Sequence, residues 1–150
     1  DAAILAVAGL KRIQLKERIT EVLPMEWMLP AIGQGAIGIE TRVGDEATLS
    51  LIQHLNDSHT WDCLLAERAL LSELEGNCQL PLAGYCVLNG EELFLRAAIG
   101  DPEGKTILRC EGSAPRQNAE RLGKDVAHSL LKNGAGELLR KAVSTAHIEF

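Results

Sequence analysis

The residue of this sequence best suited to covalent chemistry is Cys78, within the stretch from Glu67 to Gly84. Helical periodicity runs up to Leu74, and Gly76 is predicted to end the helix. Pro81 can neither continue a helix nor donate into a central sheet, so Cys78 is predicted to lie on a short loop. A thiol on a loop between two regular elements is both held in place and reachable. Its thiolate could act as a nucleophile toward an electrophilic carbon.

The commoner role of a cysteine is that of a small buried hydrophobe. The neighbours of Cys78 are small or polar and do not form the apolar wall of a core site; they are Gly76, Asn77 and Gln79. The remaining cysteines fall inside a predicted helix or predicted strands, where we expect structural roles; they are Cys63, Cys86 and Cys110. No CxxC spacing occurs, which favours free thiols in a reducing, cytoplasmic compartment.

A cysteine nucleophile of the acyl-transferase type would need a histidine base close to Cys78. The chain has four histidines, and none stands in a recognisable motif. His59 and Cys63 share one predicted helix face, but no further pair completes a tetrahedral metal site, so no metal is expected. Two alternatives stay open: an acyl transferase, or a non-catalytic α+β module for ligand sensing or subunit contact in which Cys78 is inert.

The composition argues against several classes of partner. Acidic residues outnumber basic ones by 21 to 15, the net charge is −6, and aromatic residues make up 3% of the chain. Nucleic-acid binding favours a basic surface with stacking platforms, and membrane-surface helices are basic as well. No apolar run is long enough to cross a bilayer. We therefore expect neither a nucleic-acid nor a membrane partner.

Residues 2–13 are predicted to form a helix with Asp1 as its N-cap. The helix is apolar nearly all round, so we expect it to pack inside a larger body. Arg12 falls near its carboxyl end, where a cation complements the helix dipole, and from the residues alone a structural arginine is favoured. The chain starts within this helical pattern and without a methionine, which suggests a fragment of a longer protein.

The glycines of residues 33–38 match the spacing of a dinucleotide-binding fingerprint. That site requires a strand before the glycines and a helix after them. Here a loop between Pro24 and Pro30 precedes them, and residues 37–43 alternate between apolar and polar side chains as a strand does. We therefore reject a nicotinamide cofactor. A short helix is predicted next, over residues 45–55.

The remainder is predicted to be a small α+β domain, with a three-stranded antiparallel sheet covered by helices on one face. Asn89-Gly90 is a strong hairpin signal between the first two strands. The predicted elements are a helix over 59–74 with Asn56–Ser58 as hinge and N-cap, strands over 85–88, 92–99 and 106–111, a helix from Ser113 to Leu131 capped by Asn133-Gly134, and a helix over 136–143. The predicted core positions are Trp61, Leu64, Leu65, Leu71 and Leu74 on the first helix, Leu93, Leu95, Ala97 and Ile99 on the second strand, and Leu122, Val126, Leu130 and Leu131 on the second helix.

The stretch around Cys78 resembles the signature of the porphobilinogen deaminase (hydroxymethylbilane synthase) family. In that signature a Glu-Arg pair on a helix is followed by Leu-x-Gly-small-Cys-x-aliphatic-Pro-aliphatic-small. Two positions depart from the usual pattern: Asn77 stands where Gly, Ser or Ala is common, and Leu80 replaces a β-branched residue. The corresponding residues here are Glu67, Arg68, Leu74, Gly76, Asn77, Cys78, Leu80, Pro81, Leu82 and Ala83.

The resemblance extends over essentially the whole chain and implies its domain organisation. Residues 1–30 would be the end of domain 2, and residues 31–57 the return strand and helix of domain 1 with a hinge. Together they would form the tail of a two-domain α/β body like that of periplasmic binding proteins. Residues 58–150 would be the cofactor-carrying α+β domain. The family's catalytic aspartate and most of its arginines would lie upstream, so this chain should hold no catalytic acid and be inactive alone.

The resemblance also implies the chemistry. Cys78 would carry a dipyrromethane cofactor through a thioether. Four porphobilinogen units would be added to it in turn with loss of ammonia, and hydroxymethylbilane, a precursor of haem, would be released by hydrolysis. Arg12 matches an arginine that binds the pyrrole carboxylates, to which a guanidinium fork is suited. Gln34 would line the cleft, although a tight crossover turn explains its segment equally well. The complete enzyme is expected to be a monomer, with porphobilinogen and the N-terminal part of the same protein as its partners.

Overall fold

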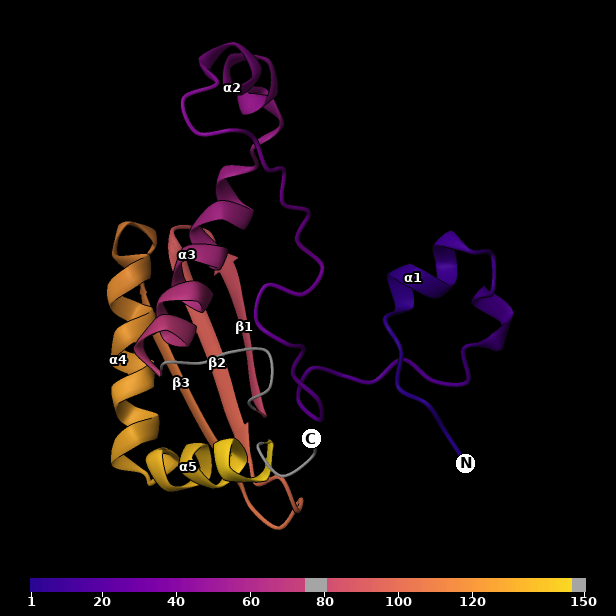
Figure 1. Cartoon of the computed structure of the whole chain (residues 1–150), viewed down its shortest axis with the longest axis vertical. Coiled ribbons are helices and arrows are strands. Elements are labelled where there is room, and N and C mark those ends of the chain that lie inside the picture. The colour runs from indigo at the N-terminus through magenta and orange to yellow at the C-terminus, as the bar shows by residue number, and fades with distance from the viewer. Residues whose placement is uncertain (75–80, 147–150) are drawn as a thin grey trace.

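The computed structural model describes residues 1–74 and 81–146, and its centre is a three-stranded antiparallel sheet (Figure 1). The strands are β1 (Leu82–Asn89), β2 (Glu92–Gly100) and β3 (Ile107–Pro115), in the order β1-β2-β3. Consecutive strands are neighbours, as short connections between antiparallel strands allow. The predicted sheet is confirmed, and each strand is longer than predicted.

The β1–β2 hairpin turns one residue later than predicted. Asn89 is the last residue of β1 and pairs with Glu92, so the turn consists of Gly90 and Glu91. Gly90 has a φ of 65°, whereas Glu91 does not have a positive φ. This is the pattern of a type II′ turn, in which glycine takes the first central position.

The inner face of β2 is buried, as its alternation predicts. The side chains at positions 93, 95, 97 and 99 are at most 1% exposed. Two helices, α3 (Ser58–Glu73) and α4 (Ala119–Lys132), lie across this face, and α5 (Ala135–Ala146) lies across one end of the sheet (Figure 1). Burying a leucine or isoleucine here stabilises the fold by roughly 1.5–3 kcal/mol. Helices on one face of an antiparallel sheet confirm the predicted α+β architecture.

The buried face of α3 differs from the predicted stripe. Trp61 is 53% exposed, whereas Ala66 and Glu67 are buried. The prediction grouped the largest apolar residues on one stripe, but α3 is packed on two sides. One side packs in the core with the sheet and α4 through Ala66, Leu70 and Leu74. The other side meets residues 31–35, which we call the crossover turn, through the side chain of Leu64.

The backbones of α3 and α4 are in direct contact at Gly123. A Cβ atom built on this glycine would lie 2.7 Å from the Cβ of Ala69 and 2.7 Å from the backbone nitrogen of Leu70, and it would overlap the carbonyl oxygen of Ala66. Close-packed interiors cannot absorb an overlap of this size without moving a helix. Glycine is therefore required at position 123 for the observed helix spacing.

α4 begins at Ala119, later than the predicted start near Ser113. The reason is strand pairing, since β3 stays paired with β2 as far as Pro115, which lies opposite Glu92. A short 3-10 turn from Arg116 then leads into the helix. Three of the four predicted core residues of α4 are buried, namely Leu122, Val126 and Leu130. The fourth, Leu131, is 39% exposed.

Two helix ends confirm the predicted caps, those at Asp57 and at Asn133-Gly134, and a third, at Asp45, has a cap that was not predicted. Asp57 Oδ1 accepts the backbone N–H of Thr60 at 2.7 Å at the start of α3. The side chain of Asp45 caps α2 (Glu46–Ile52), which continues as a 3-10 turn over Gln53–Leu55. Asn133 ends α4, and Gly134 follows with a φ of 99°. Each cap satisfies polar backbone groups that a helix end leaves without partners.

α1 (Val7–Arg12) and the residues next to it lie apart from this domain (Figure 1). α1 is shorter than the predicted helix over 2–13, and its N-cap is Ala6 and not Asp1. None of its residues is buried, and Leu5, just before it, is 62% exposed. Isolated helices of this length are marginal in water. The expected packing inside a larger body is absent among the described residues, which explains the short helix.

Residues 37–43 do not form the predicted strand. Ile37 is 93% exposed, and Val43 is fully exposed. A strand is stable only when a neighbour pairs with it. Within the described residues no segment pairs with residues 37–43. Their apolar side chains alternate as in a strand, but no neighbouring strand is present to pair with them.

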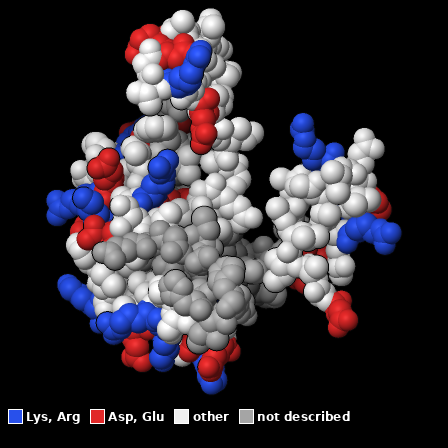
Figure 2. Space-filling model, viewed as in Figure 1, with Lys and Arg blue, Asp and Glu red and all other residues white. Residues whose placement is uncertain are grey.

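Charged side chains of both signs are mixed over the face of the domain seen in Figure 2. No helix among residues 1–74 and 81–146 combines the length and apolar character that a bilayer span requires.

We predict that Gly123→Ala destabilises the chain by about 1–3 kcal/mol, because the new methyl group overlaps α3. Equilibrium urea unfolding measures the change. Gly136→Ala is the matched control, since a Cβ there would approach only Leu131, at 3.9 Å, and alanine favours a helix. Equal stability of the two variants would contradict the proposed contact.

Candidate functional site

Cys78, the predicted nucleophile, lies outside the described residues, but the elements on both sides of its loop are described. The last residue before the gap, Leu74, is 4% exposed and packs in the core. After the gap, the carbonyl oxygen of Pro81 accepts the N–H of Gly100 at 2.9 Å, and Leu82 pairs with Ile99 in the sheet. α3 ends before residues 75–80 and β1 begins after them, so the described residues on both sides of Cys78 are fixed to the core. The loop setting of Cys78 itself stays a prediction.

Glu67 is a site residue to which sequence reasoning gave no role. Its side chain is 6% exposed, and it is the one buried charged residue among those that the structure describes. Oε2 accepts the N–H of Gly33 at 2.8 Å, and Oε1 accepts the N–H of Cys86 at 2.8 Å. Burial raises the pKa of Glu67, while the two amide hydrogen bonds oppose the rise. A glutamate directly after Ala66, on the buried side of α3, was the available signal.

Gln34, predicted to line a cleft, belongs to the crossover turn and is exposed. Its Oε1 accepts the N–H of Ala31 at 3.2 Å, so the side chain closes its own turn. Gly33 and Gly35 have φ values of 71° and 90°, which require glycine in practice. These contacts agree with the alternative of a tight crossover turn, and an exposed amide at that turn remains available to a ligand.

The crossover turn is attached to the edge of β1. Ala31 forms an isolated antiparallel bridge with Ala83, and the N–H of Gly84 donates to the carbonyl oxygen of Pro30 at 3.1 Å. Ile32 packs so close to Gly84 that a Cβ at position 84 would lie 3.0 Å from it. Gln34 is thereby brought beside the strand that follows the Cys78 loop.

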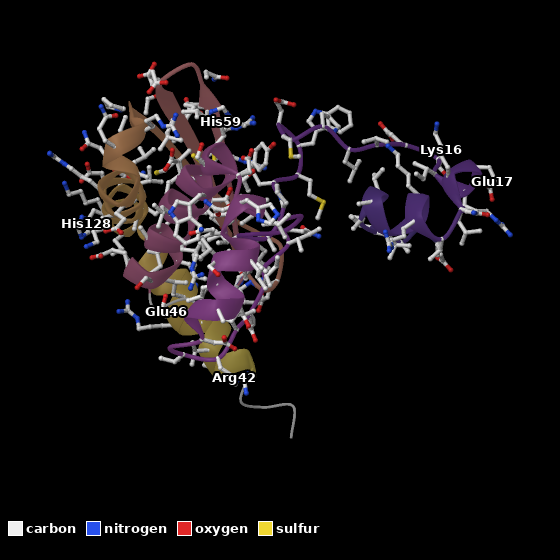
Figure 3. All side chains as sticks on the ribbon, turned by 90° about the horizontal axis from the view of Figure 1, so that it is seen from above. Lys16, Glu17, Arg42, Glu46, His59 and His128 are labelled. Atoms are coloured by element: carbon white, nitrogen blue, oxygen red, sulfur yellow. The ribbon has the colours of Figure 1, made fainter. Side chains whose placement is uncertain are left out.

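Arg12 is not brought to this region. It is the last residue of α1 and exposed, and the helix ends there in a Schellman motif, with Leu15 N–H donating to the Leu10 carbonyl at 2.9 Å. Figure 3 shows Lys16 and Glu17, just beyond α1, well apart from His59 and His128 of the carboxyl-terminal domain. The described part of the chain offers Arg12 no ion pair.

The described thiols are inside the fold. Cys63 on α3 and Cys86 on β1 hydrogen-bond to each other, and burial raises the pKa of both, that of Cys86 well above its usual range. Cys110 on β3 accepts a hydrogen bond from Asn133 Nδ2 at 3.3 Å. All three are free, and the predicted strand positions of Cys86 and Cys110 are confirmed. The thiols of Cys63 and Cys86 are poor nucleophiles, because their raised pKa values leave little thiolate.

A metal site and a histidine base, both of which the sequence disfavours, gain no support from the described residues. No group of three histidine, cysteine or acidic side chains that could hold a metal occurs among the described residues. His128 Nε2 lies 3.0 Å from Glu73 Oε1, and this exposed pair links α4 to the last turn of α3. The imidazole therefore already has a carboxylate partner.

A shallow cavity of about 310 Å³ lies on the outer face of the sheet, where residues 25–29 cross it. Arg96 Nη1 donates to Glu26 Oε1 at 3.2 Å, and Arg109 Nη2 donates to the Trp27 carbonyl at 3.2 Å. Arg96 is also stacked over Phe94, 5.8 Å from the ring centre. These contacts fix the segment that leads into the crossover turn.

Two family models match the chain. The model described as "Porphobilinogen deaminase, C-terminal domain" matches residues 61–132, and the model described as "Porphobilinogen deaminase, dipyromethane cofactor binding domain" matches residues 1–50. This chain belongs to the porphobilinogen deaminase family. Arg12 and Gln34 fall in the match whose description names the cofactor, and Cys78 falls in the match to the C-terminal domain.

We predict that Cys86 of the folded chain reacts with iodoacetamide at least roughly 100-fold more slowly than in the urea-unfolded chain. Reaction requires opening of core structure, whose free energy approaches that of global unfolding. Peptide mapping by mass spectrometry measures each rate, and the unfolded chain is the control. Labelling of Cys86 at the unfolded rate would refute the buried thiol pair.

Proposed function

We propose that this chain is the cofactor-carrying part of a hydroxymethylbilane synthase, which condenses four porphobilinogen units with loss of ammonia. The observation that carries the proposal is that the sequence holds the family's signature cysteine between α3 and β1, in a chain that belongs to the family. The catalytic acid and most carboxylate-binding arginines would come from the upstream part of the enzyme, so the chain alone should not turn over porphobilinogen.

The thiols of the chain fit attachment of a dipyrromethane at Cys78. Thioether formation joins the cysteine sulfur to an electrophilic pyrrole methylene carbon, and the sulfur must be reachable and able to ionise. Cys63 and Cys86 are hydrogen-bonded to each other with raised pKa values, and Cys110 is engaged by Asn133. The raised pKa values disfavour Cys63 and Cys86, and the family signature favours Cys78 over Cys110. When bound, the cofactor supplies the free pyrrole position onto which substrate units are added.

The remaining residues of this chain would bind and orient the pyrroles. The acetate and propionate groups of the growing chain need cationic forks, and Arg12 has an exposed guanidinium without an ion pair in the described structure. Gln34 would line the cleft from a turn that Glu67 holds beside β1. A charged hydrogen bond from Arg12 to a pyrrole carboxylate would orient the substrate as well as bind it.

The exposed amino-terminal segments support the proposed domain organisation. Residues 1–30 would complete domain 2, residues 31–57 would complete domain 1, and residues 58–150 would form the cofactor domain. The apolar side chains of Leu5, Ile37 and Val43 are exposed here and would be covered in the two-domain body, where residues 37–43 could pair as a strand. Free thiols suit a cytoplasmic enzyme, which we propose acts as a monomer.

The two rival functions make a different prediction for one inexpensive experiment. An acyl transferase, or a non-catalytic module for ligand sensing or subunit contact, would carry no pyrrole. Ehrlich's reagent gives a coloured adduct only with a bound dipyrrole. A colourless complete enzyme whose intact mass equals that of the bare polypeptide would overturn the proposed function.

We predict that Cys78→Ser abolishes the covalent mass increment of the complete enzyme, because a serine hydroxyl is a far weaker nucleophile than a thiolate. Intact-protein mass spectrometry measures the increment, and Cys110→Ser is the control that should retain it. Peptide mapping that located the adduct on another cysteine would contradict the assignment.

We predict that Arg12→Lys lowers the activity of the complete enzyme about ten- to a hundredfold with little change in melting temperature. Lysine keeps the charge but loses the bidentate fork. Arg18→Lys, an exposed change in the neighbouring 3-10 turn, should leave activity near wild type. Parallel loss of activity and melting temperature in Arg12→Lys would indicate that the arginine is structural.

A further inference from the structure

Three segments that are distant in the sequence meet at the carboxylate of Glu67. They are α3, which carries Glu67, the crossover turn, which donates from Gly33, and β1, which donates from Cys86. The donors lie 34 and 19 residues from Glu67 along the chain. We propose that Glu67 is a positioning residue, whose carboxylate holds the Gln34-bearing turn in register with α3 and β1, the elements that flank residues 75–80 in the sequence. The proposal rests on the proposed function.

Each carboxylate oxygen of Glu67 has its own amide donor. Gly33 donates to Oε2 and Cys86 donates to Oε1, both at 2.8 Å. Hydrogen bonds to an ionised acceptor are short and about twice as strong as neutral ones. Because both bonds end on one rigid, planar group, they fix the distance between the turn and the strand, which two separate side chains would not do.

The Cys86 amide is available to Glu67 because β1 is an edge strand. In an antiparallel pair, alternate residues direct their N–H groups away from the partner strand. Gly84 and Cys86 are two such residues, and their amides are taken by the Pro30 carbonyl and by Glu67. The crossover turn and Glu67 therefore occupy adjacent positions along one edge, and a shift of the turn would break the bond of Pro30 to Gly84 and that of Gly33 to Glu67.

A role in core stability alone does not account for a carboxylate at this position. Burying a charge is costly, and replacement of buried ions by apolar groups is often neutral or stabilising. What an apolar side chain could not do is accept two amides from separate segments. Leaving such amides buried without partners carries its own penalty. The carboxylate therefore fixes the position of the crossover turn relative to β1.

The fold has a second contact that would keep the turn nearby if this one were lost. Ile32 packs against Gly84, and Leu70 lies close to the same glycine. Glu67→Gln has nearly the same shape as the wild type and can accept one amide, but its NH₂ group cannot accept the other. We therefore expect this variant to fold, with the turn held by apolar contact but no longer fixed.

The test compares Glu67→Gln with wild type in the complete enzyme, by hydrogen exchange and by steady-state kinetics. Exchange of the Gly33 amide should become about ten- to a hundredfold faster, because Gly33 either loses its acceptor or keeps only a weaker, neutral one, while the Leu95 amide in the central strand stays protected. kcat should fall by a similar factor, with a smaller change in KM for porphobilinogen, because positioning and not binding is impaired. Glu73→Gln on the same helix, which removes only an exposed pair with His128, is the matched control and should change neither.

Three results would overturn the proposal. Unchanged exchange at Gly33 would show that Glu67 does not hold the turn. Faster exchange at Gly33 and Leu95 together would show a general loss of stability. Faster exchange at Gly33 with wild-type kcat would show that the placement of the turn does not matter for the reaction. Failure of the proposed function is seen separately, since wild-type enzyme would then lack a dipyrrole while the exchange at Gly33 still reports on Glu67.

Discussion

The carboxyl-terminal domain depends on the contact between α3 and α4 that glycine at position 123 makes possible. With no side chain at that point, the α4 backbone reaches the backbone of α3 beside Ala66. This contact sets the depth and rotation of α3 over the sheet. Glu67 follows Ala66 directly, so the same rotation directs its carboxylate to the edge of β1. The placement of a polar group on one helix thus follows from the absence of a methyl group on another.

Polar groups inside this domain serve to join segments. Arg116 joins the start of α4 to α3 through Asp62, with Nε donating to Oδ2 at 2.8 Å. Glu67 joins α3 to β1 and to the crossover turn. Buried polar groups with all partners present favour one packing arrangement over its competitors. The apolar core supplies the driving force for folding, and these bridges select how the elements are placed.

Local rules predicted the parts of the fold that depend on a few neighbouring residues. The alternation along β2 correctly gave its buried face, and Asp57 and Gly134 correctly marked helix ends. The face of α3 could not be read in this way, because apolar residues occur all round it and two different surfaces cover it. The start of α4 was predicted too early because pairing with β2 holds Pro115 in a strand, and pairing is not a local property.

The site could be predicted only in part for the same reason. Cys78 was selected from its predicted loop setting and its signature, which are local in the sequence, and it stays a prediction because it lies outside the described residues. Glu67 was part of that signature, but its role depends on Gly33, 34 residues away along the chain. Residues 37–43 have the alternation of a strand and lack a partner among the described residues. Pattern shows what a segment could form, and only the available neighbours decide whether it does.

The attachment of the crossover turn to β1 also defines where this domain ends. Along the sequence the natural place to divide the chain is before Asp57, at the start of α3. In space, however, Leu29 is 8% exposed and Ala31 is bridged to Ala83, so residues 29–35 belong to the same packed unit. A cut before α3 would remove a piece of that unit, and it would leave the Gly84 amide and one carboxylate oxygen of Glu67 without their partners. The folding unit is therefore discontinuous in the sequence, with the loop containing α2 as an excursion from it.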